Sequence, residues 1–203
     1  MRFDLQRKII LENKRVKLEP LSFNHLNSLL LIAKNNPNLL KYSPSKFGNR
    51  EFLKEYIESA LNSKSTNKRY PFAIFDKVQN KYVGSTSYGN ISNNDKRLEI
   101  GWTWLGTEFQ GTGLNKHCKY LLLKFAFDKL KFERIELKTD SRNLQSRKAI
   151  EKIGGKFEGE LRSHTLMLDG HRRNTVYYSI LKNEWEITKN TIFGEIKTAH
   201  NTS

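Results

Sequence analysis

A chain of 203 residues is long enough to form one domain with its own hydrophobic core. No apolar run approaches the roughly 20 residues that cross a bilayer, which excludes a membrane-spanning helix. The first residues lack the apolar segment and cleavage site of a signal peptide, and the single cysteine, Cys118, cannot form an internal disulfide. We therefore expect a cytoplasmic protein that does not associate with membranes.

The formal net charge of +15 and the isoelectric point near 9.8 favour an anionic partner. Nucleic acid, a ribosomal surface and a phosphorylated coenzyme would each fit this charge. The basic residues are spread along the whole chain rather than gathered in one tract, which favours a lysine-rich solvated surface. Nucleic-acid binding is therefore an alternative that the sequence does not favour.

The N-terminal third is predicted to be a polar lead-in, one strand and two helices. Residues 1–13 form the lead-in, and alternating apolar side chains predict a strand over 15–19. Ser22 is a suitable N-cap for a helix with leucines at helical spacing. Two prolines within 35–48 predict a loop, which a second helix over 49–62 follows.

Three consecutive strands are predicted next, over 71–75, 81–88 and 98–104. Short polar turns separate them, so the strands should pair antiparallel. The third strand ends at Gly106 and leads into a glycine-rich segment.

This segment, Gln110-Gly-Thr-Gly113, precedes an apolar helix predicted over 114–126. The first turn of a helix has unpaired N–H groups and partial positive charge, and glycines let the backbone approach a bulky anion. The sequence therefore predicts a phosphate cradle. It matches neither the Walker A motif nor the dinucleotide fingerprint, which would need glycine at Lys116. Cys118 lies on the apolar stripe of the helix, so we interpret it as a packing residue.

The C-terminal third is predicted to contain a strand, a helix and a hairpin. The strand covers 134–138, and Asn143 can cap a helix that ends at Gly154. Two strands over 157–167 and 171–181 then flank a favourable Asp-Gly turn.

Two separate motifs resemble the GNAT superfamily of acetyl-coenzyme A-dependent N-acetyltransferases. The pattern Gln110-x-x-Gly113-x-Asn115 is similar to the family signature Gln/Arg-x-x-Gly-x-Gly/Ala, although Asn115 replaces the usual small residue. Residues 140–159 resemble the family's loop around an asparagine, here Asn143, with the helix and strand that follow it. Further segments resemble the RimJ/RimL group within the family, namely 99–105, 136–140 and 169–179.

The resemblance implies an α+β fold with a central mixed, mostly antiparallel sheet of about seven strands and helices on both faces. Residues 14–185 would form a single GNAT domain. Residues 186–203 lose their periodicity and are predicted to be a frayed or disordered tail.

The resemblance also implies a coenzyme site. The backbone of Trp104 and Leu105 would pair with the pantetheine arm of acetyl-coenzyme A, and Asn143 would donate or accept a hydrogen bond at the same arm. The residues that would hold the pyrophosphate are Gln110, Gly111, Thr112, Gly113, Leu114 and Asn115.

Two side chains are candidates for catalysis of acetyl transfer to an amine. Glu99, on the strand that would line the cleft, is the candidate general base, acting directly or through water. Ser146 is the candidate hydrogen-bond donor to the departing sulfur, because many GNAT enzymes have a tyrosine where this chain has Ile150. No cluster of ligands predicts a metal site.

The sequence therefore predicts direct transfer of an acetyl group from acetyl-coenzyme A to a primary amine in a ternary complex. The acceptor would be a protein N-terminus, such as that of a ribosome-associated protein, or a small-molecule amine. The alternative is a non-catalytic module that binds coenzyme A or nucleic acid on the same fold. The edge of the last hairpin could support a homodimer.

Overall fold

The computed structural model describes residues 2–198 of the chain. Its strands are β1 (Leu11–Glu12), β2 (Val16–Pro20), β3 (Arg69–Asp76), β4 (Lys81–Ser92), β5 (Arg97–Leu105), β6 (Arg134–Asp140), β7 (Lys156–Leu166) and β8 (Arg172–Leu181). Its helices are α1 (Leu26–Asn35), α2 (Arg50–Ser65), α3 (Leu114–Lys124), α4 (Leu144–Glu151), α5 (Lys182–Thr191) and α6 (Gly194–Thr198). Short helical segments are η1 (Phe23–His25), η2 (Thr107–Phe109) and η3 (Phe125–Lys129), the last of which extends α3.

All eight strands of the described residues join one sheet, in the order β1-β2-β3-β4-β5-β6-β8-β7. Every neighbouring pair is antiparallel except β5 and β6, which are parallel. The predicted mixed, mostly antiparallel sheet is confirmed. The one strand beyond the predicted seven is the two-residue β1, which is too short to leave a pattern in the sequence.

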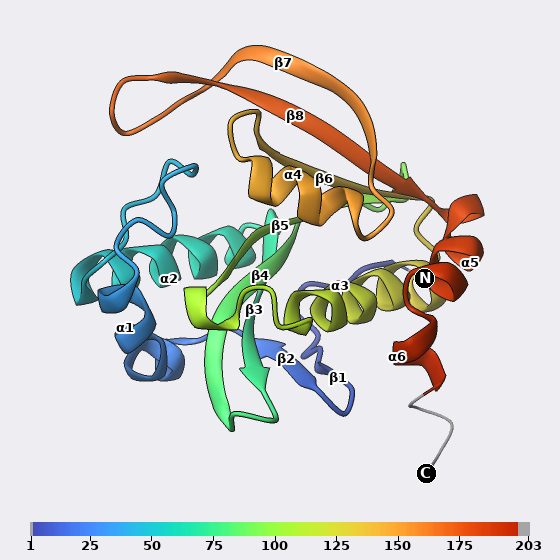
Figure 1. Ribbon diagram of the computed structural model, residues 1–203, viewed down its shortest axis with the longest axis horizontal. Coiled ribbons are helices and arrows are strands. Elements are labelled where there is room, and N and C mark those ends of the chain that lie inside the picture. The colour runs from blue at the N-terminus through green and yellow to red at the C-terminus, as the bar shows by residue number, and fades with distance from the viewer. Residues whose placement is uncertain (1, 199–203) are drawn as a thin grey trace.

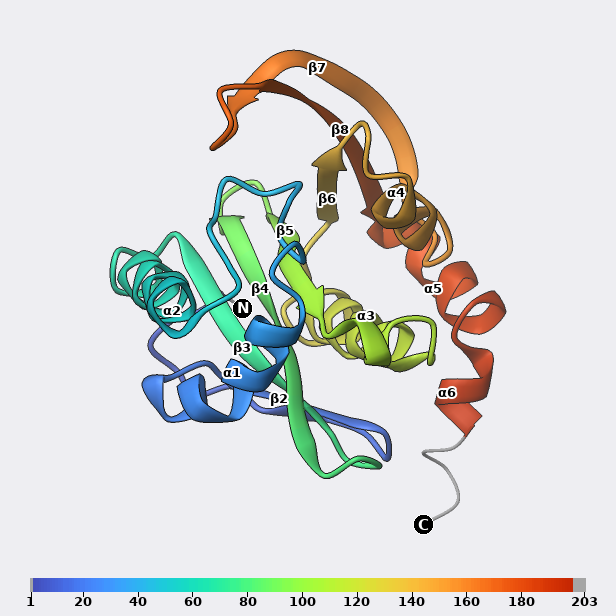
Figure 2. The same ribbon diagram turned by 60° about the vertical axis from the view of Figure 1, so that its left-hand side comes forward.

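Helices cover both faces of the sheet, as predicted. Figure 2 shows α1 and α2 on one face of β3 and β4, and α3 on the opposite face. The apolar stripes of these helices form the two halves of the core. Fully buried side chains include Leu29, Leu53 and Ile57 on one side and Leu114 and Leu122 on the other. No helix among residues 2–198 has the length and apolar character needed to cross a bilayer.

The polar lead-in and the frayed tail are both wrong as predictions. Phe3 and Leu5 are buried in the core, and the Tyr70 hydroxyl ties this segment down by accepting a hydrogen bond from the Ile9 N–H at 2.9 Å. At the other end α5 and α6 run along the molecule beside α3 (Figure 1). Trp185 on α5 and Phe193 between α5 and α6 are buried in the core. The part of the tail prediction that concerns residues 199–203 lies outside the described residues.

Sheet register places the most important irregularity between β5 and β6. Their parallel pairing covers only Arg97 to Glu99 on β5 and Arg134 to Glu136 on β6. Beyond these residues the two strands separate, so the last part of β5 has a free edge towards β6. A parallel edge of this kind leaves N–H and C=O groups available to an extended ligand.

A half-buried carboxylate on β2, Glu19, gives a prediction for acid stability. Burial alone would raise the pKa of Glu19, but hydrogen bonds from Lys17, Tyr82 and His25 outweigh burial and lower the pKa to about 2. A carboxyl whose pKa is lower in the folded state stabilises the fold above its unfolded pKa, here 4.5, and loses this contribution as the pH falls towards 2.

We therefore expect Glu19→Gln to lower the free energy of unfolding at pH 7 by about 1–2 kcal/mol, after allowance for partial exposure of the group. The variant should also lose less stability than the wild type between pH 5 and 2, as urea denaturation at a series of pH values would measure. The exposed Glu55→Gln is the matched control. Identical pH dependence of the Glu19 and Glu55 variants would contradict this assignment.

Candidate active site

A β-bulge lies just beyond the point where β5 separates from β6. Gly101 pairs with Ser87 on β4 and Trp104 with Ser85, so Trp102 and Thr103 together stand opposite one residue. Trp102 has a φ of 52°, which is rare for a bulky side chain. This conformation turns the strand and re-aims the side chains that follow. Bulges of this kind recur beside active sites, and here one lies where the sheet opens.

The predicted phosphate cradle forms the next part of the chain. Gly111 and Gly113 have φ values of 74° and 83°, and an added Cβ at either position would meet no atom within 4 Å. The glycines are thus needed for their backbone conformation, and the space around them is open. No side chain caps α3, so the N–H groups of its first turn face this space. Such a helix start can bind an anion.

Gln110 connects this loop to both sides of the opening. Its side-chain N–H donates to the Leu105 carbonyl at 2.9 Å, which holds the loop against the end of β5. Its Oε1 accepts from the Gln145 amide at 2.8 Å, and Gln145 belongs to α4. Asn115, on the first turn of α3, has a buried Oδ1 with no partner among the described residues. An additional donor, such as an ordered water, could satisfy this oxygen.

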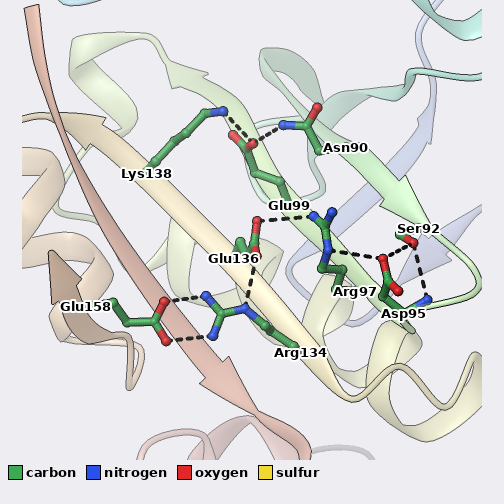
Figure 3. Close-up of polar contacts among 9 residues, drawn as sticks. All are labelled: Asn90, Ser92, Asp95, Arg97, Glu99, Arg134, Glu136, Lys138 and Glu158. Atoms are coloured by element: carbon green, nitrogen blue, oxygen red, sulfur yellow. Dashed lines mark hydrogen bonds and ion pairs between the residues drawn. The ribbon is translucent and has the colours of Figure 1, made fainter. Parts of the chain in front are cut away.

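Glu99 is the last residue of β5 that pairs with β6, and it is almost completely buried. Its Oε2 accepts hydrogen bonds from the Asn90 amide at 2.6 Å and from the Lys138 ammonium at 2.9 Å (Figure 3). Burial would lower the pKa of Lys138, but the Glu99 carboxylate raises it by a larger amount. Oε1 takes part in neither contact. It lies 2.6 Å from the place where a side chain at Gly101 would begin, so a side chain there would displace the carboxylate.

A pocket of about 500 Å³ opens beside this carboxylate. The side chains around it come from β4, β5, β6 and β8. Residues that line it are Asn90, Ile91, Ser92, Arg97, Glu136, Lys138 and Tyr177. The pocket therefore lies on the α1–α2 face of the sheet, beyond the part that these helices cover, next to the opening between β5 and β6.

The charges around the pocket are arranged in pairs. Arg97 lies 3.8 Å from Glu136, which Arg134 also contacts at 3.0 Å (Figure 3). Arg134 in turn forms an ion pair with Glu158 on β7. With Lys138 beside Glu99, each of these carboxylates has a cation next to it. The pocket is polar without carrying a large excess of either charge.

The second candidate catalytic residue lies on the other side of the opening. Asn143 caps α4, because its Oδ1 accepts from the Ser146 backbone N–H at 3.0 Å. The Ser146 hydroxyl is not needed for this cap and is half-buried. The Asn143 amide N–H groups and the Ser146 hydroxyl can therefore both act as donors. They follow β6, the second strand of the opening.

Two side chains that contact Glu99 were not predicted from the sequence. Lys138 and Asn90 hold Glu99, and neither was identified, because their pairing with Glu99 depends on strand register across the sheet. The bulge was not identified either, because the alternation of bulky apolar residues from Leu98 to Trp104 continues through it in the sequence.

Other expectations concerned cysteine and metal ions. Cys118 is completely buried and burial raises the pKa of its thiol to about 12, which fits the packing interpretation. Within residues 2–198 no group of three or more histidine, cysteine, aspartate or glutamate side chains is placed to hold a metal ion.

Comparison with known proteins agrees with this geometry. The family model described as "Acetyltransferase (GNAT) domain" matches residues 15–156. The chain belongs to the GNAT acetyltransferase family. The matched residues of this GNAT chain include the free edge of β5, the glycine loop and α3.

Among relatives, this GNAT chain is 35% identical over 103 residues to the Bacillus subtilis (strain 168) protein named "Putative ribosomal N-acetyltransferase YdaF". The match covers 51% of this chain and only 55% of YdaF, about half its length. It supports the predicted likeness to the RimJ/RimL group.

Two solved structures share the fold. A GCN5-related N-acetyltransferase from Brucella melitensis superposes with a TM-score of 0.85 at 24% identity, over 93% of this chain and 85% of that one. Ribosomal-protein-S5-alanine acetyltransferase from Vibrio fischeri gives a TM-score of 0.68 at 20% identity, over 87% and 98% of the two chains.

Proposed function

We propose that this protein transfers the acetyl group of acetyl-coenzyme A directly to a primary amine. The observation that carries the proposal is the free edge of β5, which leads from the buried carboxylate of Glu99 towards an uncapped helix start. Alignment of the two reactants in one ternary complex would supply most of the rate gain.

The coenzyme would bind along this edge. Backbone groups of Trp104 and Leu105 would pair with the pantetheine arm, and Asn143 would hydrogen-bond it from the other side. The pyrophosphate would contact the loop amides from Gln110 to Asn115. The open space around Gly111 and Gly113 supports this fit, because a bulky anion could approach the backbone there.

The acceptor amine would enter from the pocket. It arrives as an ammonium and must lose a proton before it can attack. Oε1 of Glu99 would take this proton, directly or through a water, while Asn90 and Lys138 hold Oε2. The amine nitrogen then bonds to the carbonyl carbon and the carbon–sulfur bond breaks. The thiolate leaves with a hydrogen bond from the Ser146 hydroxyl, and the second proton that the nitrogen loses passes to the sulfur through this hydroxyl.

Ser146→Ala tests that last step. We expect turnover to fall about 100-fold, the lower end of the usual gain from a positioned proton donor. Because Asn143 provides the cap of α4, the free energy of unfolding should change by less than about 0.5 kcal/mol. Release of free thiol and urea denaturation measure the two effects. Ser141→Ala is the control, and equal activity of the two variants would remove Ser146 from the mechanism.

The acceptor we favour is the α-amine of a protein N-terminus. The name of YdaF points to ribosomal proteins as substrates of that relative. In the pocket, Glu99 and Glu136 already face cations, so a polycationic acceptor such as a polyamine would find little excess negative charge. The net charge of +15 would repel it further.

A thiol-release assay with defined acceptors tests this function. Peptides that begin with a free serine or alanine should release coenzyme A in the presence of acetyl-coenzyme A, and mass spectrometry should find one acetyl group on the N-terminal amine. The same peptides with a blocked N-terminus are the control, and spermidine represents polyamines. Faster turnover of spermidine than of every peptide would overturn the acceptor assignment.

A further inference from the structure

The indole N–H of Trp104 is a buried donor without an acceptor. Trp104 is only 4% exposed, and its Nε1 has no hydrogen-bond partner among the described residues. Buried polar groups are nearly always paired, and each exception calls for an explanation. Trp185, the other buried tryptophan, follows the rule, since its Nε1 donates to Asp128 at 2.7 Å.

The residues around the indole show on which face of the sheet it lies. The Trp104 ring packs against Phe47 at 5.1 Å and Tyr56 at 5.9 Å between ring centroids. Tyr56 belongs to α2, so the ring lies on the α1–α2 face of the sheet. The neighbouring Thr103 faces α3 instead, where its hydroxyl accepts from Lys119 at 2.6 Å. The indole therefore lies on the same face as Glu99 and the pocket, away from the helix of the phosphate cradle.

One of the two covering rings can be displaced more easily than the other. The Tyr56 hydroxyl donates to the Trp102 carbonyl at 3.4 Å and accepts from Arg69 at 2.8 Å, which fixes its ring. Phe47 lies between α1 and α2 in a segment that contains neither helix nor strand. Such a segment can move without breaking a helix or a sheet. Movement of Phe47 would remove one of the two rings that pack on the indole.

We propose that the indole N–H of Trp104 donates a hydrogen bond to a carbonyl oxygen of the bound amine acceptor, after Phe47 moves aside. This assignment rests on the proposed acetyl transfer and makes Trp104 a specificity-determining residue for the acceptor. A neutral N–H donor suits an amide carbonyl, such as the first peptide carbonyl after an N-terminal amine. An acceptor without a carbonyl near its amine leaves the donor unpaired and binds more weakly.

Trp104→Phe removes the N–H and retains most of the ring. With a peptide that begins with free serine as the acceptor, we expect the KM for the peptide to rise about tenfold. The affinity for acetyl-coenzyme A, measured by calorimetry, should stay unchanged. The melting temperature should stay equal or rise, because the variant loses a buried unpaired donor.

Trp185→Phe is the matched control. It removes a donor that is already paired within the fold, so we expect a lower melting temperature and an unchanged KM for the peptide. An unchanged KM for the peptide in Trp104→Phe would overturn the assignment. If coenzyme binding were weaker at the same time, the indole N–H would instead donate to the coenzyme.

Nuclear magnetic resonance of the protein with ¹⁵N-labelled tryptophan provides a readout that does not need turnover. The indole signal absent from Trp104→Phe should shift when the serine peptide is added to the protein with free coenzyme A. Coenzyme A alone should shift it less, since its expected contact is with the backbone of Trp104 and not with the indole. No shift with the peptide would overturn the inference. Failure of the proposed function is distinct, since the wild type would then release no thiol with any acceptor.

Discussion

Glu99→Gln should lower the turnover of an N-terminal peptide by at least 100-fold while acetyl-coenzyme A still binds. General bases contribute about 10²–10⁴-fold, and the amide of glutamine cannot accept the proton of the incoming ammonium. Asn90 can still hydrogen-bond the new side chain, so the geometry of β5 should persist. Thiol release at saturating coenzyme measures turnover, and calorimetry measures coenzyme affinity.

The ion pair with Lys138 requires a control for stability. Glu99→Gln leaves the Lys138 ammonium without its carboxylate in a half-buried site, which destabilises the fold. The double variant Glu99→Gln with Lys138→Met removes both charges and should recover much of the lost stability without recovering activity. Recovery of activity together with stability would show that Glu99 acts only through the fold.

Gly113→Glu should weaken binding of acetyl-coenzyme A at least 100-fold. The new carboxylate would lie at the open start of α3, where the pyrophosphate is expected, and two like charges about 4 Å apart repel by ~4 kcal/mol near a protein surface. Each 1.4 kcal/mol corresponds to a factor of about ten in affinity. Calorimetric titration of the variant with acetyl-coenzyme A measures this change.

Gly170→Glu is a closely matched control. Gly170 in the turn between β7 and β8 has a φ of 80°, close to the 83° of Gly113, and open space around it. Each substitution should reduce stability by about 1–2 kcal/mol through the left-handed backbone conformation. Only the change at Gly113 should affect coenzyme binding. Equal affinities of the two variants would remove the glycine loop from the coenzyme site.

The sequence predicted those elements whose signal is local. The apolar stripe of α3 and the Asp-Gly turn between β7 and β8 each lie within a few neighbouring residues, and both are found close to the predicted positions. The C-terminal helices were missed because the residues after Trp185 are mostly polar. Trp185 stacks on Phe127, with ring centroids 5.4 Å apart, and this contact depends on tertiary packing.

In the candidate site, too, only features with a local sequence signal could be predicted. The cradle from Gln110 to Asn115 could be predicted because it is a continuous turn before a helix. The partners of Glu99 could not, since Lys138 is distant in sequence and meets Glu99 only through the parallel register of β5 and β6. The unpaired Trp104 N–H could not be predicted either, because its surroundings come from Phe47 and Tyr56, which are distant in sequence.

Thermal unfolding of the wild-type protein with acetyl-coenzyme A tests the central claim most directly. A ligand at 100 times its dissociation constant adds about 2.7 kcal/mol, which corresponds to a rise of about 5–10 °C in melting temperature for a chain of this size. We expect this rise with acetyl-coenzyme A and with free coenzyme A, and a smaller one with ATP. No rise with either coenzyme at millimolar concentration would contradict a coenzyme site between β5 and β6, and with it the proposed acetyl transfer.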